Sequence, residues 1–136
     1  MIVRVLIVDD EPDVETLFRQ QFRREVRQEL YTLDFASSGK AALDILDSHI
    51  GEEIILLVSD INMPGMTGLE LLPVVKQRRP DLPVFMISAY GDQDTIAIAV
   101  ERGANGFLTK PVDFPRLKRD IITVMAGATG DRKSVV

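Results

Sequence analysis

The stretch IILLVSD at Ile54–Asp60 decides the fold, because it is an apolar run that ends in an aspartate. Continuous apolar runs of this length are typical of strands buried on both faces of a parallel sheet. Two similar runs cover residues 2–8 and 84–87. A shorter run at Gly106–Thr109 and an alternating one at 31–36 complete five predicted strands, the alternating one being expected at a sheet edge.

Segments with one apolar face, typical of helices, follow these strands. Pro12 suits a first helical turn, and Gly103 ends a helix predicted over 92–102. Strand and helix alternate five times, which predicts right-handed crossovers, a doubly wound parallel sheet and helices on both faces. The first helix is expected to be long and unbroken. Its predicted apolar face consists of Val14, Leu17, Phe18, Phe22, Val26 and Leu30.

The composition limits the classes of function. The 136 residues suit one domain, expected over residues 1–125, with 126–136 as a tail or the start of a linker. The absence of cysteine and the single histidine exclude disulfides, thiolate zinc sites and sites with several histidines. No apolar run is long enough to cross a bilayer, and the first residues do not read as a signal peptide, so a cytoplasmic protein without membrane contact is expected. The net charge of −5 argues against nucleic-acid binding by this domain.

Reactive side chains follow four of the five predicted strands. Asp9 and Asp10 follow the first strand and Asp60 ends the third, while Ser88 and Lys110 follow the fourth and fifth. The carboxyl ends of parallel strands meet at one edge of the sheet, where sites form near the switch point in strand order. We therefore expect three carboxylates, a hydroxyl and an ammonium group to converge there.

These residue types indicate phosphate chemistry. Clustered carboxylates repel one another, so a divalent cation is their natural partner. Oxygen ligands alone favour magnesium, or manganese, over zinc. The lysine and the hydroxyl would contact phosphoryl oxygens, and a free carboxylate oxygen would attack phosphorus.

Four motifs in this order resemble those of a response-regulator receiver domain. They are Asp9-Asp10, Asp60-Ile61-Asn62-Met63-Pro64-Gly65, Ser88-Ala89 and Lys110-Pro111, each at the end of the proper strand. The resemblance covers residues 2–125, nearly the whole chain. It implies a flavodoxin-like fold with five helices and strand order 2-1-3-4-5, which makes the strand at 31–36 an edge strand.

The resemblance also implies a phosphoacceptor and a metal site. Asp60 would take a phosphoryl group from the phosphohistidine of a histidine kinase or phosphotransfer protein. Asp9, Asp10 and Asp60 would bind Mg²⁺, or Mn²⁺, together with the backbone carbonyl of Asn62. The chain would thus be a regulatory domain of a two-component system rather than an enzyme, taking part in its own phosphorylation and dephosphorylation.

Further positions match parts of the family's switch. Lys110 and Ser88 would contact the phosphoryl group, Phe107 would be the aromatic switch, and the Lys110-Pro111 bond would be cis. Partner binding would change on the face formed by the fourth helix, fifth strand and fifth helix, and a phosphorylation-dependent dimer is one such change. The downstream effector is not named by the sequence. Tyr90 and Asn62 flank the site and would set the lifetime of the phosphoryl group.

Two other functions compete with this interpretation. An aspartyl-phosphate phosphatase of the haloacid-dehalogenase type places its nucleophile after the first strand with a second acid two residues later, whereas Asn62 stands two positions beyond Asp60 here. A receiver-like module that binds partners without phosphorylation usually lacks a site residue. A row of arginines on the first helix indicates a solvated face, with a docking role as the minority hypothesis. They are Arg19, Arg23, Arg24 and Arg27.

Overall fold

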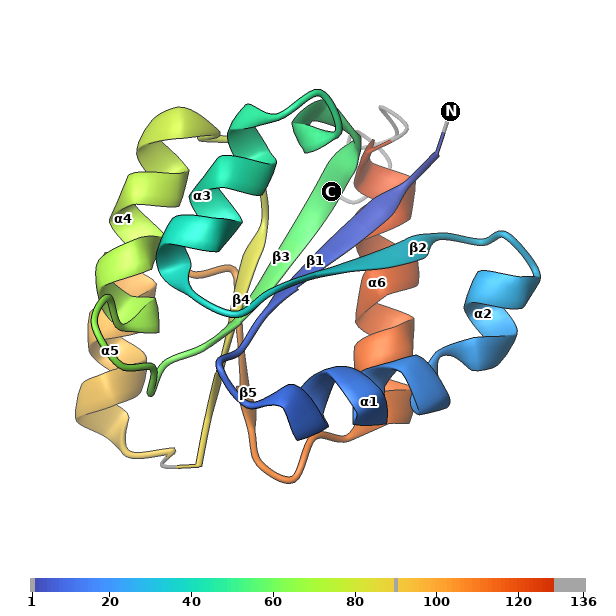
Figure 1. Cartoon of the computed structure of the whole chain (residues 1–136). Coiled ribbons are helices and arrows are strands. Elements are labelled where there is room, and N and C mark those ends of the chain that lie inside the picture. Colours follow the sequence, from blue (N-terminus) through green and yellow to red (C-terminus); the bar gives the residue numbers. More distant parts are fainter. Residues whose placement is uncertain (1, 90, 129–136) are drawn as a thin grey trace.

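The core of the protein is one sheet of five parallel strands in the order β2-β1-β3-β4-β5 (Figure 1). The computed structural model describes residues 2–89 and 91–128. The strands are β1 (Arg4–Val8), β2 (Thr32–Ala36), β3 (Ile54–Asp60), β4 (Val84–Ser88) and β5 (Gly106–Thr109). The predicted doubly wound fold is confirmed, including the edge position of β2.

Helices cover both faces of this sheet (Figure 1). One layer contains α1 (Pro12–Gln21), α2 (Arg23–Arg27) and α6 (Phe114–Ala128), and the other contains α3 (Gly39–Asp47), α4 (Gly68–Arg78) and α5 (Gln93–Glu101). Side chains alternate along a strand, so each strand contributes to both layers. Leu57 and Met86 belong to the core beneath α3–α5, while Val58 and Ile87 belong to the core beneath α1 and α6.

The prediction of five helices with a long first one is wrong, since there are six α-helices in the described part of the chain. The helix is interrupted at Phe22, whose φ of −106° and ψ of 12° are not helical. The Phe22 side chain is fully buried, stacks on Phe18 at 5.8 Å and meets Phe114 edge-on at 6.0 Å. Burying this ring in the core bends the chain, so α2 lies beside the start of β2 instead of continuing α1 (Figure 1).

The predicted apolar face is only partly buried, and the break accounts for the exposure of its last two residues. Phe18 and Phe22 are buried, but Leu17, Val26 and Leu30 are 42%, 39% and 42% exposed. The last two residues lie beyond the bend, where the helical period no longer points toward the sheet.

Two further differences concern the ends of elements. A short 3₁₀ helix, η1 (Gly51–Glu53), precedes β3 and was not predicted. A Cβ at Gly51 would lie 1.9 Å from the carbonyl oxygen of Leu46, so only glycine fits this turn. Helix α6 continues beyond the predicted domain end at residue 125 to Ala128, and the remainder of the predicted tail lies outside the described residues.

No helix in the described ranges is both long and apolar enough to span a membrane.

Candidate functional site

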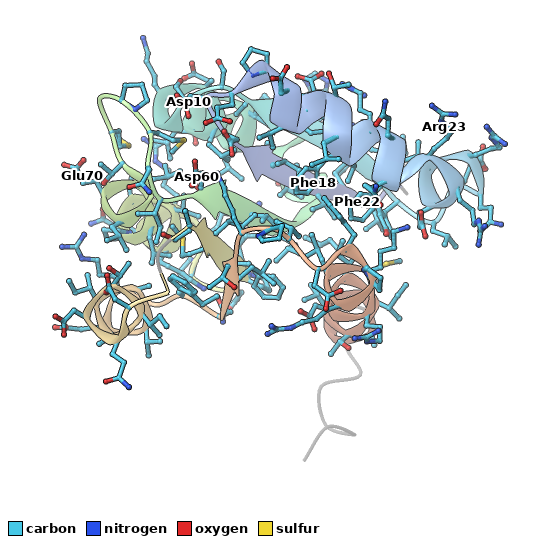
Figure 2. The ribbon with its side chains drawn as sticks, turned by 90° about the horizontal axis from the view of Figure 1, so that it is seen from below. Asp10, Phe18, Phe22, Arg23, Asp60 and Glu70 are labelled. Carbon is cyan, nitrogen blue, oxygen red and sulfur yellow. The ribbon has the colours of Figure 1, made fainter. Side chains whose placement is uncertain are left out.

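Three carboxylates gather where β1 and β3 end. One oxygen each of Asp9, Asp10 and Asp60 lies within 4.8 Å of the other two. Asp60 is the last residue of β3, and its side chain is only 4% exposed, while that of Asp9 is 7% exposed. Figure 2 shows Asp10 and Asp60 on the same side of the molecule, at the end of the sheet where α1 begins. The structure thus brings these predicted residues together.

Lys110 is the cation of this site. Its Nζ lies 3.5 Å from Oδ2 of Asp60 and 4.0 Å from Oδ2 of Asp9. The backbone N–H of Lys110 donates to the carbonyl of Ser88 at 2.9 Å, which fixes the end of β5 against β4. The Lys110-Pro111 peptide bond is cis. One ammonium group faces three carboxylates, so the site keeps an excess of negative charge.

The electrostatics of Asp9 reflect this excess. Burial raises the pKa of the Asp9 carboxyl, and the N–H of Glu11, which donates to Oδ1 at 2.9 Å, opposes that shift. The neighbouring charge of Asp60 raises the pKa of Asp9 further, while Lys110 lowers it. A bound cation would offset both the cost of burying the charged Asp9 carboxylate and its repulsion by Asp60.

The expected switch residues lie on neighbouring strands. Ser88, the last residue of β4, is 2% exposed, and the preceding residue of β4 pairs with Asp60. Phe107 in β5 pairs with Met86 in β4, and its partly buried side chain packs against the core beneath α3–α5. Asn62 is exposed, and its backbone N–H points to Oδ1 of Asp60 at 3.4 Å. Ser88 and Asn62 therefore border the acidic cluster. Phe107 lies further from the carboxyl end of the sheet, level with Met86, which is two residues before Ser88.

Tyr90, expected to influence the lifetime of a phosphoryl group, lies outside the described residues. Its neighbour Gly91 lies close to β5, since a Cβ there would be 2.9 Å from Cγ2 of Thr109.

The loop after Asp60 depends on two features that were not predicted. Thr67 and Glu70 form a capping box, in which Oγ1 of Thr67 accepts from the Glu70 N–H at 3.2 Å and Oε1 of Glu70 accepts from the Thr67 N–H at 2.9 Å. Gly68, the first residue of α4, donates its N–H to the carbonyl of Ile61 at 2.9 Å. A Cβ at Gly68 would lie 2.3 Å from the carbonyl oxygen of Asp60. The Thr-x-x-Glu spacing could have identified the helix start, but only the structure reveals the close backbone approach.

The donor atoms fit a magnesium or manganese ion. Carboxylate and carbonyl oxygens at this edge are hard ligands, and no histidine or cysteine from the described part of the chain belongs to the cluster. A hollow of about 250 Å³ lies beside Asp9 and Asp10 and is bounded by Pro12 and Ala36, but neither Asp60 nor Lys110 lines it.

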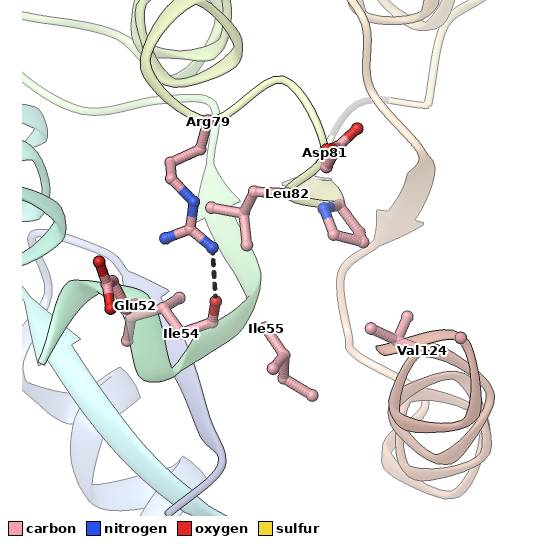
Figure 3. A pocket seen from close by; sticks show the side chains of 9 residues that line it. Glu52, Ile54, Ile55, Arg79, Asp81, Leu82 and Val124 are labelled. Atoms are coloured by element: carbon pink, nitrogen blue, oxygen red, sulfur yellow. Dashed lines mark hydrogen bonds between the residues drawn. The ribbon is translucent and has the colours of Figure 1, made fainter. Parts of the chain in front are cut away.

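The opposite end of the sheet contains a different hollow of about 310 Å³ (Figure 3). Apolar residues such as Leu82 and Val124 line much of it. Arg79 donates from Nη1 to the carbonyl of Gly51 at 2.7 Å and from Nη2 to the carbonyl of Ile54 at 3.2 Å. This guanidinium therefore ties the end of α4 to η1 and to the start of β3, which is a structural role.

Comparison with known proteins places this arrangement in a large family. The model of the response regulator receiver domain matches residues 5–122. The response regulator protein PilR of Pseudomonas aeruginosa is 39% identical over 124 residues, which cover 90% of this chain and 26% of PilR. The DNA-binding transcriptional regulator NtrC of Escherichia coli K12 is 37% identical over 110 residues, covering 81% of this chain and 22% of NtrC. The chain thus spans about a quarter of the length of these curated relatives.

Solved structures share the fold. A CheY-like receiver domain from Methanospirillum hungatei has a TM-score of 0.83 at 24% identity and covers 96% of this chain and 99% of its own. The receiver domain of a putative LuxO repressor from Vibrio parahaemolyticus has a TM-score of 0.82, also at 24% identity, covering 96% of this chain and 95% of its own.

Proposed function

The chain belongs to the response regulator receiver family of two-component signalling, and from this premise we propose that Asp60 accepts a phosphoryl group from the phosphohistidine of a histidine kinase or phosphotransfer protein. The observation that carries the proposal is the contact of Lys110 with Asp60 inside a cluster of three carboxylates. A buried aspartate with an ammonium group 3.5 Å from one of its oxygens is positioned for phosphoryl transfer.

The proposed reaction is a displacement at phosphorus. A carboxylate oxygen of Asp60 bonds to phosphorus as the bond between phosphorus and the imidazole nitrogen breaks, and that nitrogen keeps the electron pair. The product on this chain is an acyl phosphate. Asp9, Asp10 and Asp60, with the backbone carbonyl of Asn62, would hold Mg²⁺ or Mn²⁺, which supplies positive charge beside the phosphoryl oxygens. Lys110 would neutralise a further phosphoryl oxygen.

The signal would be read through Ser88 and Phe107. The new phosphoryl charge would draw the Ser88 hydroxyl inward, and Phe107 would then turn into the vacated space. Such a charge shifts the conformational equilibrium only if the active arrangement pairs it better. The responding face, formed by the predicted fourth helix, fifth strand and fifth helix, corresponds here to α5, β5 and α6.

Exposed apolar side chains on two of these elements support a change in partner binding or dimerisation at this face. Ile98 and Val100 of α5 are 39% and 61% exposed, and Ile122 of α6 is 51% exposed. The match covers only about a quarter of the curated relatives, so the rest of their length says nothing about the effector of this chain. We propose residues 1–125 as the receiver unit. It would act as a regulatory domain without nucleic-acid binding of its own. A cytoplasmic location remains a prediction.

A small phosphodonor tests the proposal without the cognate kinase. We expect acetyl phosphate with Mg²⁺ to label the wild-type chain and the Asp44→Asn control, whose aspartate lies exposed on α3. Labelling should be lost in Asp60→Asn and in the presence of EDTA. Labelling of Asp60→Asn at the wild-type level would mean that another carboxylate is the acceptor. Turnover of small phosphate esters would instead favour the phosphatase.

A further inference from the structure

A group of arginines on the short helix α2 has no role in the site described above. Arg23, Arg24 and Arg27, here named the α2 arginine ridge, are exposed. No ion pair joins them to any residue in the described ranges 2–89 and 91–128. Figure 2 shows Arg23 on α2, well away from Asp10 and Asp60. The ridge is therefore remote from the phosphorylation site.

The charges of these arginines do not all favour their own helix. Arg23 and Arg27 are spaced i,i+4, where like charges repel, and Arg23 at the helix start opposes the helix dipole, whereas Arg27 in the last turn complements it. The acidic residue of α2, Glu25, does not compensate them, because its Oε2 pairs with Lys118 of α6 at 3.1 Å and its side chain is only 16% exposed. The unpaired positive charge is thus directed to solvent, which points to a role outside the fold.

Two hollows flank the ridge and share Arg23 and Arg27. The one toward α6 measures about 600 Å³ and adds Arg24, Lys118 and the amides of Gln20, Gln21 and Gln28. No carboxylate from the described part of the chain lines it, although the whole chain carries a net charge of −5. This hollow is suited to an anionic group.

The second hollow, of about 290 Å³, has a different character. It lies toward the edge strand β2 and is bounded by Val26, Thr32 and Leu33 as well as by Arg19. Val26 is 39% exposed. The ridge therefore joins a cationic hollow to a partly apolar one.

We propose that the α2 arginine ridge binds an acidic segment of a partner protein. Carboxylates of that segment would pair with Arg23, Arg24 and Arg27, and its apolar side chains would contact the exposed Val26. Charge complementarity between an acidic segment and the ridge supports this occupant. The apolar hollow and the acidity of the rest of the chain favour a peptide over nucleic acid. This surface is independent of Asp60 and goes beyond the proposed phosphoacceptor function.

Binding of a model peptide tests the proposal. The probe is a fluorescein-labelled peptide in which leucine alternates with pairs of glutamate, and the control peptide has glutamine in place of glutamate. Arg23→Gln/Arg27→Gln should weaken binding about three- to thirtyfold at low salt, as expected for the loss of two exposed ion pairs. Lys40→Gln/Arg116→Gln changes the net charge equally on other elements and should leave binding unchanged.

Three further results would overturn the proposal. They are failure of the wild-type chain to prefer the glutamate peptide, equal weakening by both double variants, and tighter binding of duplex DNA than of the peptide. Circular dichroism verifies that Arg23→Gln/Arg27→Gln is folded, and labelling of Asp60 by acetyl phosphate should be unaffected in it. Loss of peptide binding with intact labelling separates this surface from the phosphoacceptor site.

Discussion

Neutralising Asp9 should stabilise the fold when no metal is present. The substitution Asp9→Asn retains Oδ1 as acceptor for the Glu11 N–H but removes a charge whose side chain is 7% exposed. At separations up to 4.8 Å, each of its repulsions with Asp10 and Asp60 is worth about 3.5 kcal/mol at an effective dielectric constant of about 20. Its attraction to Lys110 at 4.0 Å is worth about 4 kcal/mol on the same basis. The net repulsion is about 3 kcal/mol, and less than about 1 kcal/mol if the site is screened as in water.

The free energy of unfolding in urea, measured by circular dichroism with EDTA present, should therefore be about 1–3 kcal/mol higher for Asp9→Asn than for the wild type near neutral pH. The pKa of Asp9 is raised in the folded state above its ordinary value of 3.8. The protonated carboxyl thus contributes stability below pH 3.8, and that contribution is lost as the pH rises through the folded-state pKa. The advantage of the variant should accordingly vanish below pH 3.8 and be complete above that raised pKa.

Adding Mg²⁺ should stabilise the wild type more than Asp9→Asn, because the cation binds the folded acidic cluster. The control Asp44→Asn, at an exposed position, should change stability by less than about 0.5 kcal/mol. An Asp9→Asn chain that is less stable than the wild type in EDTA at neutral pH would refute the reasoning, since attraction to Lys110 would then outweigh repulsion and burial.

Four substitutions test the framework of the fold and of the site. Gly68→Ala should destabilise the fold by about 1–3 kcal/mol and weaken labelling of Asp60, because the new Cβ would meet the Asp60 carbonyl at 2.3 Å. Phe22→Ala, which empties a fully buried position, should cost about 3–5 kcal/mol by urea denaturation, whereas Leu17→Ala, at a residue 42% exposed, should cost less than about 0.5 kcal/mol. Thr67→Ala should cost about 1 kcal/mol through loss of the helix cap.

Each of these expectations has a contradicting outcome. Wild-type stability of Gly68→Ala would mean that the loop after β3 relaxes freely. Equal costs for Phe22→Ala and Leu17→Ala would contradict the difference in burial between these two side chains. An unchanged free energy of unfolding for Thr67→Ala would show that solvent replaces the cap.

The convergence of Asp9, Asp10, Asp60 and Lys110 could be predicted because it follows from topology. Parallel strands end at one edge, so residues that follow different strands meet there whatever their separation along the chain. The apolar runs that mark these strands are local features and are read directly from the residues.

The break at Phe22 could not be predicted in the same way. The helical period of apolar residues continues past Phe22 to Val26 and Leu30, so the local pattern indicates one helix. The ring contacts of Phe22 with Phe18 and Phe114 override that pattern, and Phe114 lies far along the chain. The role of Gly68 was hidden for a related reason, because the approach of its backbone to Asp60 depends on how a loop packs.

The identity of the acceptor residue is the central claim, and mass spectrometry tests it most directly. After reaction with acetyl phosphate and Mg²⁺, borohydride reduction converts an aspartyl phosphate to homoserine, and peptide mapping locates the altered residue. We predict homoserine at Asp60 and at no other aspartate. Homoserine at Asp9 or Asp10 with Asp60 unmodified would contradict the assignment.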